Sequence, residues 1–414
     1  MPASATASDG ASRAADAETA GPAHVATVSF LASRAVPSGG FLVALAGGTA
    51  LARVAQRHGY RQGYGASLAA MLETVAIMGP ARFGVPLTQA LSAPLLGGLH
   101  AREWGVAAQV AVCGLIRVLS NAIGVAFFIF VITGGLDAYS GAYENLAGWF
   151  GIELGQTATL AVTVGLVVLW AVAASIAQVL IYRRGLLRWP SEAVEGTPPP
   201  AVPERHTGRF DPRAAMAAAA IAFALLLSGT WWPLLGAVVA WLALAAAFAR
   251  ADWRSARTGF VIAAVLATGA LVFSLTGGLG VEVALQRGLR AGLLVLTATW
   301  LRAAAGADGL REVFRRTLGR LRGLPGVVEA IRVLDHIGSE GQLDRAGRSL
   351  VVLAVEAPLQ PKPLVDAVLA WVFDQTGRFR PGTPSAAPVM RVRLVDVALV
   401  VAAALPVVAL VGVA

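Results

Sequence analysis

Apolar runs separated by short polar connectors fill most of this chain. In the first half, residues 106–135 and 157–182 form runs that reach or exceed the roughly 20 residues a helix needs to cross a bilayer. Three shorter, glycine-rich runs at 39–55, 64–79 and 84–99 fit tilted or re-entrant helices. We therefore expect four to five membrane spans in this half.

The second half contains a more regular series of apolar runs. They cover residues 214–227, 231–248, 259–275, 285–305 and 395–413. Arginines follow the second and fourth runs, whereas the connector after the third run has no basic residue. Because Lys and Arg are enriched in cytoplasmic loops, this alternation predicts five crossings with the C-terminus outside. The whole chain is predicted to be an all-α, polytopic membrane protein with about nine or ten transmembrane helices.

The segment 308–380 is too rich in charge to lie in a bilayer. Its apolar residues recur at helical spacing, first as Leu310, Val313, Phe314, Leu318 and Leu321 and later as a stripe over 364–372. Arginines surround the first stripe, so we predict amphipathic helices on the cytoplasmic side. These helices either couple a partner's motion to the spans or rest on the lipid surface as anchors.

The polar stretches divide the chain into two membrane domains. Residues 1–24 are small and polar and lack the pattern of a signal peptide, so we expect a disordered tail. An N-terminal membrane domain then covers 25–190. The proline-rich residues 191–208 form a linker, and a second membrane domain, which includes the cytoplasmic helices, covers 209–414.

Composition supports the membrane class and excludes several functions. The chain is 57% hydrophobic and only 14% charged, whereas soluble domains average about 25% charged residues. Its net charge of +9 comes from arginines between the spans, so we expect no nucleic-acid partner. Lys362 is the only lysine, and it is not in a phosphate-binding loop. We expect no cofactor and no enzymatic activity, and any ATP would be bound by another chain.

A few polar residues lie within apolar runs. Glu73 and Arg117 are ionisable, and Asn121 follows Arg117 by one helical turn. Charges inside a membrane are costly and mark substrate sites or polar pathways, although Arg117 could also reach the interface from the end of a span. The histidines are scattered without ligand spacing, so we predict no metal site.

Four short motifs lie in order along the second half. They are Phe210-Asp211-Pro212-Arg213, Ala251-Asp252-Trp253-Arg254, the glycine- and arginine-rich 286–292, and 391–396 before the last run. In this order, residues 209–414 resemble the T component, the transmembrane coupling subunit of energy-coupling-factor importers, which is similar to cobalt-transporter coupling proteins. The resemblance implies helical membrane spans and cytoplasmic coupling helices.

The resemblance also implies docking residues for ATPase subunits. Members of this family carry two Ala-Arg-Gly motifs whose arginines enter grooves of the two ATPase chains. The corresponding places here, 344–348 and 375–379, contain arginine without the complete motif. The residues implied for docking are Arg345, Arg348 and Arg378. The alternative for all three is a solvated cytoplasmic charge.

The expected function is that of the transmembrane component of an importer in the cytoplasmic (inner) membrane. It would couple ATP hydrolysis by partner subunits to uptake of a vitamin, metal ion or other small solute. Residues 25–190 would bind the substrate themselves or act beside a separate substrate-binding membrane subunit. Two alternatives stay open: a membrane scaffold that binds a cytoplasmic partner or anionic lipid, and a secondary permease that uses Glu73 and Arg117.

Overall fold

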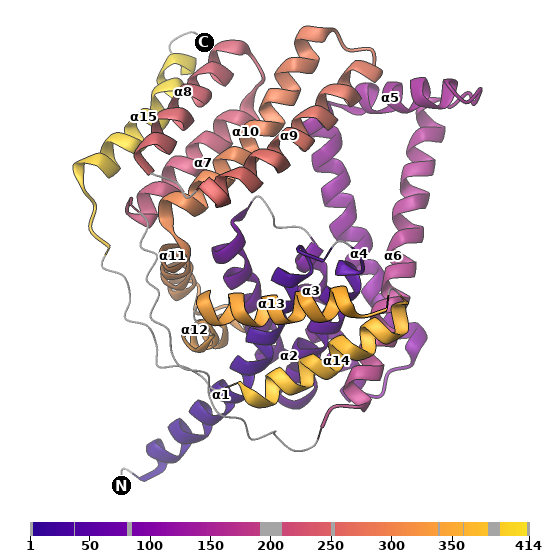
Figure 1. Ribbon diagram of the computed structural model, residues 1–414, viewed down its shortest axis with the longest axis vertical. Helices are drawn as coiled ribbons and strands as arrows, with labels where there is room; N and C mark the ends of the chain where they lie inside the picture. Colours follow the sequence, from indigo (N-terminus) through magenta and orange to yellow (C-terminus); the bar gives the residue numbers. More distant parts are fainter. Residues whose placement is uncertain are drawn as a thin grey trace.

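The computed structural model describes residues 3–36, 38–80, 85–190, 209–249, 253–337, 340–358, 360–379 and 390–411. Regular structure in these residues is helical throughout, with no strand, which confirms the all-helical class (Figure 1). The helices are α1 (Ala3–Ala32), α2 (Gly40–Met78), α3 (Val85–Ala101), α4 (Val106–Phe127), the π-helical η2 (Phe128–Thr133), α5 (Leu136–Gly148), α6 (Gln156–Leu187), α7 (Pro212–Ser228), α8 (Trp232–Ala249), α9 (Trp253–Thr276), α10 (Val281–Ala305), α11 (Ala307–Arg320), α12 (Val327–His336), α13 (Glu340–Glu356), α14 (Pro361–Arg378) and α15 (Leu394–Val411).

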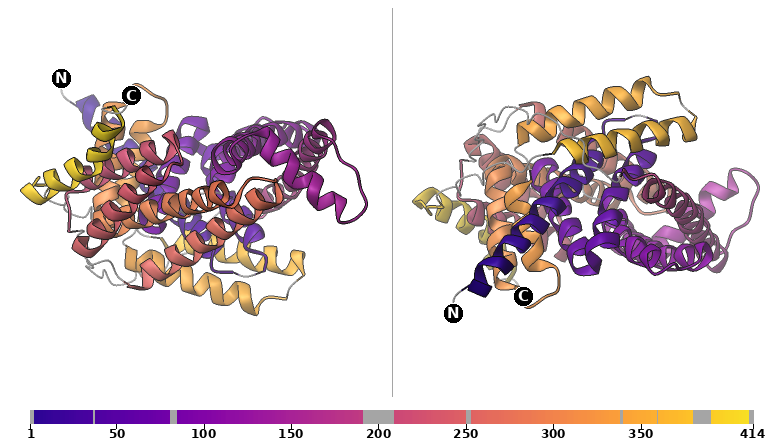
Figure 2. Two further views of the ribbon diagram at one scale, coloured as in Figure 1. Left: turned by 90° about the horizontal axis from the view of Figure 1, so that it is seen from above. Right: turned by 90° about the horizontal axis from the view of Figure 1, so that it is seen from below.

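The helices form three groups. α7, α8, α9, α10 and α15 pack together as a bundle, and α4 and α6 form a long pair joined at one end by α5 (Figure 1). Between them, α2 packs closely on both α1 and α3. α12 and α14 pack against α1 and α2, and α13 packs against α1. Figure 2 shows α13 and α14 side by side along one flank of the molecule. The cytoplasmic helices predicted from the sequence thus lie directly on the N-terminal half.

The N-terminal end differs from the expected disordered tail. The structure places these residues in α1, whose later part lies in the main hydrophobic core. Alanine, the residue of highest helix propensity, recurs through this stretch, and tertiary burial adds to that preference. Val28 and Phe30 are fully buried against the neighbouring helices.

The glycine-rich runs also differ from separate short spans. Two of them belong to one element, α2, which is kinked at Gly59, where φ is 83°. Both α2 and α3 are largely enclosed by other helices. Their small side chains let helix backbones approach one another, which explains why these runs are apolar yet rich in glycine.

Four helices are long and apolar enough to cross a membrane. They are Val106–Thr133, Gln156–Leu187, Trp232–Ala249 and Ala256–Thr276, and two shorter apolar helices cover Pro212–Ser228 and Leu394–Pro406. This set, found among the described residues, is smaller than the nine or ten spans expected from the sequence. α10 is outside it because it carries four charged residues, Glu282, Arg287, Arg290 and Arg302.

The contact between α2 and α3 depends on Gly97. A Cβ atom there would overlap the carbonyl oxygen of Ala52, which is backbone and cannot rotate away. We expect Gly97→Ala to lower the free energy of unfolding by about 1–3 kcal/mol through overpacking. Gly124→Ala on α4, where the added methyl meets nothing within 4 Å, is the matched control. Equal thermal midpoints of the two variants in detergent would contradict this close approach.

Candidate coupling site between the two halves

A buried ion pair joins α2 to α11. The Glu73 carboxylate is fully buried, and Arg311 Nε donates a hydrogen bond of 2.7 Å to its Oε2. Arg311 Nη2 donates to the other carboxylate oxygen, so the guanidinium binds Glu73 through two parallel hydrogen bonds. Its Nη1 donates to Asp308 Oδ1 at 2.8 Å. This fork geometry gives both strength and a fixed orientation.

The surroundings of Arg311 raise its pKa. Burial by itself lowers the pKa of Arg311, but the attraction and hydrogen bonds of Glu73, followed by the attraction of Asp308, raise it above its ordinary value. The guanidinium is therefore protonated at any physiological pH. A buried charge pair of this kind stabilises the fold only while both partners are present, because either one alone would be buried without compensation.

Two further ion pairs link α10 to α13 and α2 to α12. Arg302 on α10 donates from Nε to the carbonyl oxygen of Ile77 at 2.7 Å and from Nη2 to Glu340 Oε1 on α13 at 2.9 Å. Arg61 on α2 lies 2.7 Å from Glu329 on α12. The set Glu73, Arg311, Asp308, Arg302 and Glu340 is called the junction below. It fastens α2, α10, α11 and α13 to one another.

A cavity of about 330 Å³ lies beside the junction. It is bounded by α1, α2 and α13, and its lining includes Ile77, Glu340, Asp344 and Arg348. The space separates part of α13 from the core helices, whereas Leu350 further along the same helix is fully buried in the core. α13 is therefore held in place by its apolar stripe and by Glu340. The cavity lies beside the turn of α13 that carries Asp344 and Arg348.

The three arginines implied for docking lie on the exposed surface of α13 and α14. Arg348 is 71% exposed and pairs with Asp344 at 2.7 Å, and Arg378 is 57% exposed and pairs with Asp374 at 2.7 Å. Arg345 is also exposed. Such exposed pairs within one helix are worth about 0–1 kcal/mol, so they exchange easily for an external partner. Their docking role stays a prediction.

The prolines between α13 and α14 start a helix. α13 ends at Glu356, and α14 begins at Pro361 with proline in its first turn, where a missing N–H costs nothing. The proline-containing stretch thus separates two amphipathic helices that lie side by side.

Arg117 is buried in a second polar cluster. Its Nη2 donates to Gln178 Oε1 on α6 at 2.6 Å, and the guanidinium lies 5.8 Å from the ring of Phe41. Gln178 Nε2 in turn donates to Ser92 Oγ on α3 at 2.8 Å. Arg117 is only 3% exposed, so it does not extend toward an interface. Asn121 lies one turn further along α4, half-buried.

Glu73 and Arg117 do not form a pair with one another. Glu73 is bound by Arg311, and Arg117 is bound by Gln178, in different parts of the fold. Sequence reasoning missed both partners. Gln178 left a signal, since it is a polar residue within an otherwise apolar run, whereas Arg311 was one of many arginines in its segment.

Two of the four motifs behind the importer resemblance meet in space. Asp211 caps α7 by accepting a 3.0 Å hydrogen bond from the backbone of Arg213, and its own backbone N–H donates to Asp396 Oδ1 at 2.8 Å. The other oxygen of Asp396 accepts from the backbone of Arg393 at 2.7 Å. This buried carboxylate joins the starts of the first and last helices of the second half.

The junction combines burial, opposite charges and contacts between distant parts of the chain, but the described residues include no group of three His, Cys, Asp or Glu that could hold a metal ion. No protein-family model, curated protein or solved structure matches this chain.

Proposed function

We propose that this protein is the transmembrane coupling component of an ATP-driven importer of the energy-coupling-factor type. One observation carries the proposal. The cytoplasmic helices are fastened to α2 through the buried junction, while the arginines of α13 and α14 are exposed to solvent. A coupling element needs this combination of a fixed inner contact and an accessible outer contact.

The proposed location is the cytoplasmic membrane, with several helices crossing it. The four long apolar helices and the two shorter ones support this, as do exposed apolar side chains such as Ile123 and Leu169 on the α4 and α6 pair. Arg183, Arg184 and Arg188 cluster at the end of α6, which favours a cytoplasmic position for that end.

Mechanistically, closure of two ATPase subunits on ATP would displace α13 and α14. The displacement would pass through Glu340 to Arg302 and through the Arg311–Glu73 pair to α2, which packs on α6. A rigid ion-pair junction transmits such a movement as a unit, and the membrane helices then reorient around the substrate. The chain contributes position and force, and its partners contribute ATP hydrolysis.

Charge reversal on α13 tests the outer contact. We expect Arg345→Glu combined with Arg348→Glu to reduce the ATPase that copurifies with the tagged protein in mild detergent by roughly tenfold or more, because like charges in an interface cost several kcal/mol. Arg378→Glu tests α14 in the same way. The control is Arg320→Glu combined with Arg322→Glu, which changes the charge equally on the exposed end of α11.

Two results would count against the proposal. If no ATPase copurifies with the unchanged protein, the importer role fails and a scaffold role is favoured. If the α13 variant and the α11 control retain equal amounts of ATPase, α13 is not the docking surface.

A further inference from the structure

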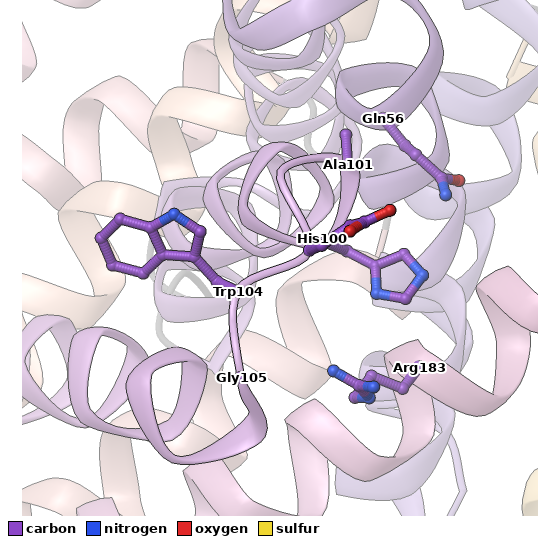
Figure 3. A pocket seen from close by; sticks show the side chains of 7 residues that line it. Gln56, His100, Ala101, Trp104, Gly105 and Arg183 are labelled. Carbon is purple, nitrogen blue, oxygen red and sulfur yellow. The ribbon is translucent and has the colours of Figure 1, made fainter.

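A pocket of about 460 Å³ lies where α3 passes into α4, beside the end of α6 (Figure 3). Its lining residues are Gln56, His100, Ala101, Glu103, Trp104, Gly105 and Arg183. Figure 3 shows Gln56, His100 and Arg183 around one space, contributed by α2, α3 and α6. The pocket is separate from the junction, and the proposed coupling mechanism does not use it.

The pocket lies at the ends of two candidate membrane spans. Gly105 directly precedes α4, and Arg183 is four residues before the end of α6 at Leu187. Trp104, which is 45% exposed, sits at the entrance to α4. Tryptophan and arginine are the residues that gather at the level of lipid headgroups. The pocket therefore lies at headgroup level on the proposed cytoplasmic side.

Hydrogen-bond donors dominate one side of the pocket. Arg183 forms no ion pair with any carboxylate that the structure describes. Gln56 accepts a 2.7 Å hydrogen bond from Arg53 through its oxygen, which leaves its amide hydrogens for a ligand. Burial, followed by the charge of Arg183, lowers the pKa of His100, so at neutral pH its ring is uncharged and can still donate one hydrogen bond.

Glu103 gives the pocket one acidic group. Its φ of 59° is the one left-handed value found outside glycine among the described residues. This conformation is uncommon for glutamate, and such strained residues concentrate at binding sites. The lining thus offers a cation and neutral donors together with one carboxylate.

We propose that this pocket binds the phosphoethanolamine headgroup of a membrane lipid. The phosphate would accept hydrogen bonds from Arg183, His100 and Gln56, and the ammonium would donate to Glu103. A purely anionic headgroup would leave Glu103 opposed to negative charge, and a choline headgroup has no N–H to donate. This inference rests on the membrane location of the proposed function, but not on its ATPase partner.

The test uses the full-length protein and native mass spectrometry with lipids of matched acyl chains. We expect phosphatidylethanolamine to bind roughly tenfold more tightly than phosphatidylcholine or phosphatidylglycerol, which corresponds to about 1.4 kcal/mol. Arg183→Gln should weaken binding of all three lipids, which share the phosphate, whereas Glu103→Gln should abolish the preference. Arg188→Gln, on the same helix end but paired with Asp366, is the control that should retain it.

Three outcomes would overturn the assignment. Phosphatidylglycerol could bind as tightly as phosphatidylethanolamine, or Glu103→Gln could leave the preference unchanged. Water-soluble glycerophosphoethanolamine could also bind as well as the lipid, which would identify a free solute as the ligand. Copurification of an ATPase is measured separately, so failure of the lipid assignment and failure of the importer role give different results.

Discussion

Arg311→Met is expected to lower the free energy of unfolding by about 3–5 kcal/mol, the usual cost of breaking a buried ion pair from one side. The variant leaves Glu73 fully buried without the guanidinium that now binds both carboxylate oxygens. Met fills a similar volume, so the loss of stability reports the unpaired charge of Glu73 rather than a new cavity. Thermal unfolding in detergent, followed by circular dichroism, measures it.

The double variant separates stability from coupling. Glu73→Leu with Arg311→Met removes both charges, and we expect it to recover most of the lost stability, since apolar replacements of buried ion pairs are often neutral. Removing the exposed pair Asp344 and Arg348 in the same way is the control, with an expected effect of about 0–1 kcal/mol.

The double variant also tests the mechanism. If the junction transmits movement, the variant should fold and still bind its ATPase, yet hydrolyse ATP without matching uptake of solute. Full coupling in a stable double variant would show that the movement passes elsewhere. An unchanged midpoint for Arg311→Met would show that Glu73 is not closed off from water.

The sequence predicted which helices are apolar throughout and which are amphipathic, because hydrophobic periodicity and length are local properties. The runs at 106–135 and 157–182 appear as α4 with η2 and as α6, and the amphipathic stripes of 308–380 appear as α11 to α14. Each of these features depends on residues close together in the chain.

The contacts of the site could not be predicted in the same way. Glu73 and Arg311 are 238 residues apart, and Arg117 and Gln178 are 61 residues apart. Composition shows that a charge in an apolar run needs a partner, but the choice among many arginines depends on tertiary packing. The ordered helix α1 could not be predicted for the same reason. It is buried by other helices, and the local pattern of small residues does not show that burial.

Acid is expected to weaken the contact between α1 and the end of α14 through His24. This residue is 6% exposed, its ring lies 4.7 Å from that of Phe379, and its Nδ1 has no hydrogen-bond partner. Burial lowers the pKa of His24 from 6.5 to about 4. Burial in the folded protein therefore favours the uncharged ring.

The sign of the pH effect follows from this lowered pKa. Above pH 6.5 the ring is neutral in both the folded and unfolded states, and stability is fully present. As the pH falls from about 6.5 to about 4, only the unfolded state binds the proton, so stability decreases by roughly 3 kcal/mol, at about 1.4 kcal/mol for each pKa unit. Thermal midpoints measured across this range should fall accordingly.

His24→Phe should remove this part of the pH dependence while preserving the ring contact with Phe379. His336→Gln, at a more exposed position on α12, is the matched histidine control. Because Phe379 directly follows Arg378, undocking of this end would also displace the arginine proposed to bind an ATPase. Acid should therefore weaken ATPase copurification in the unchanged protein more than in His24→Phe, and equal losses in the two proteins would rule His24 out as the cause.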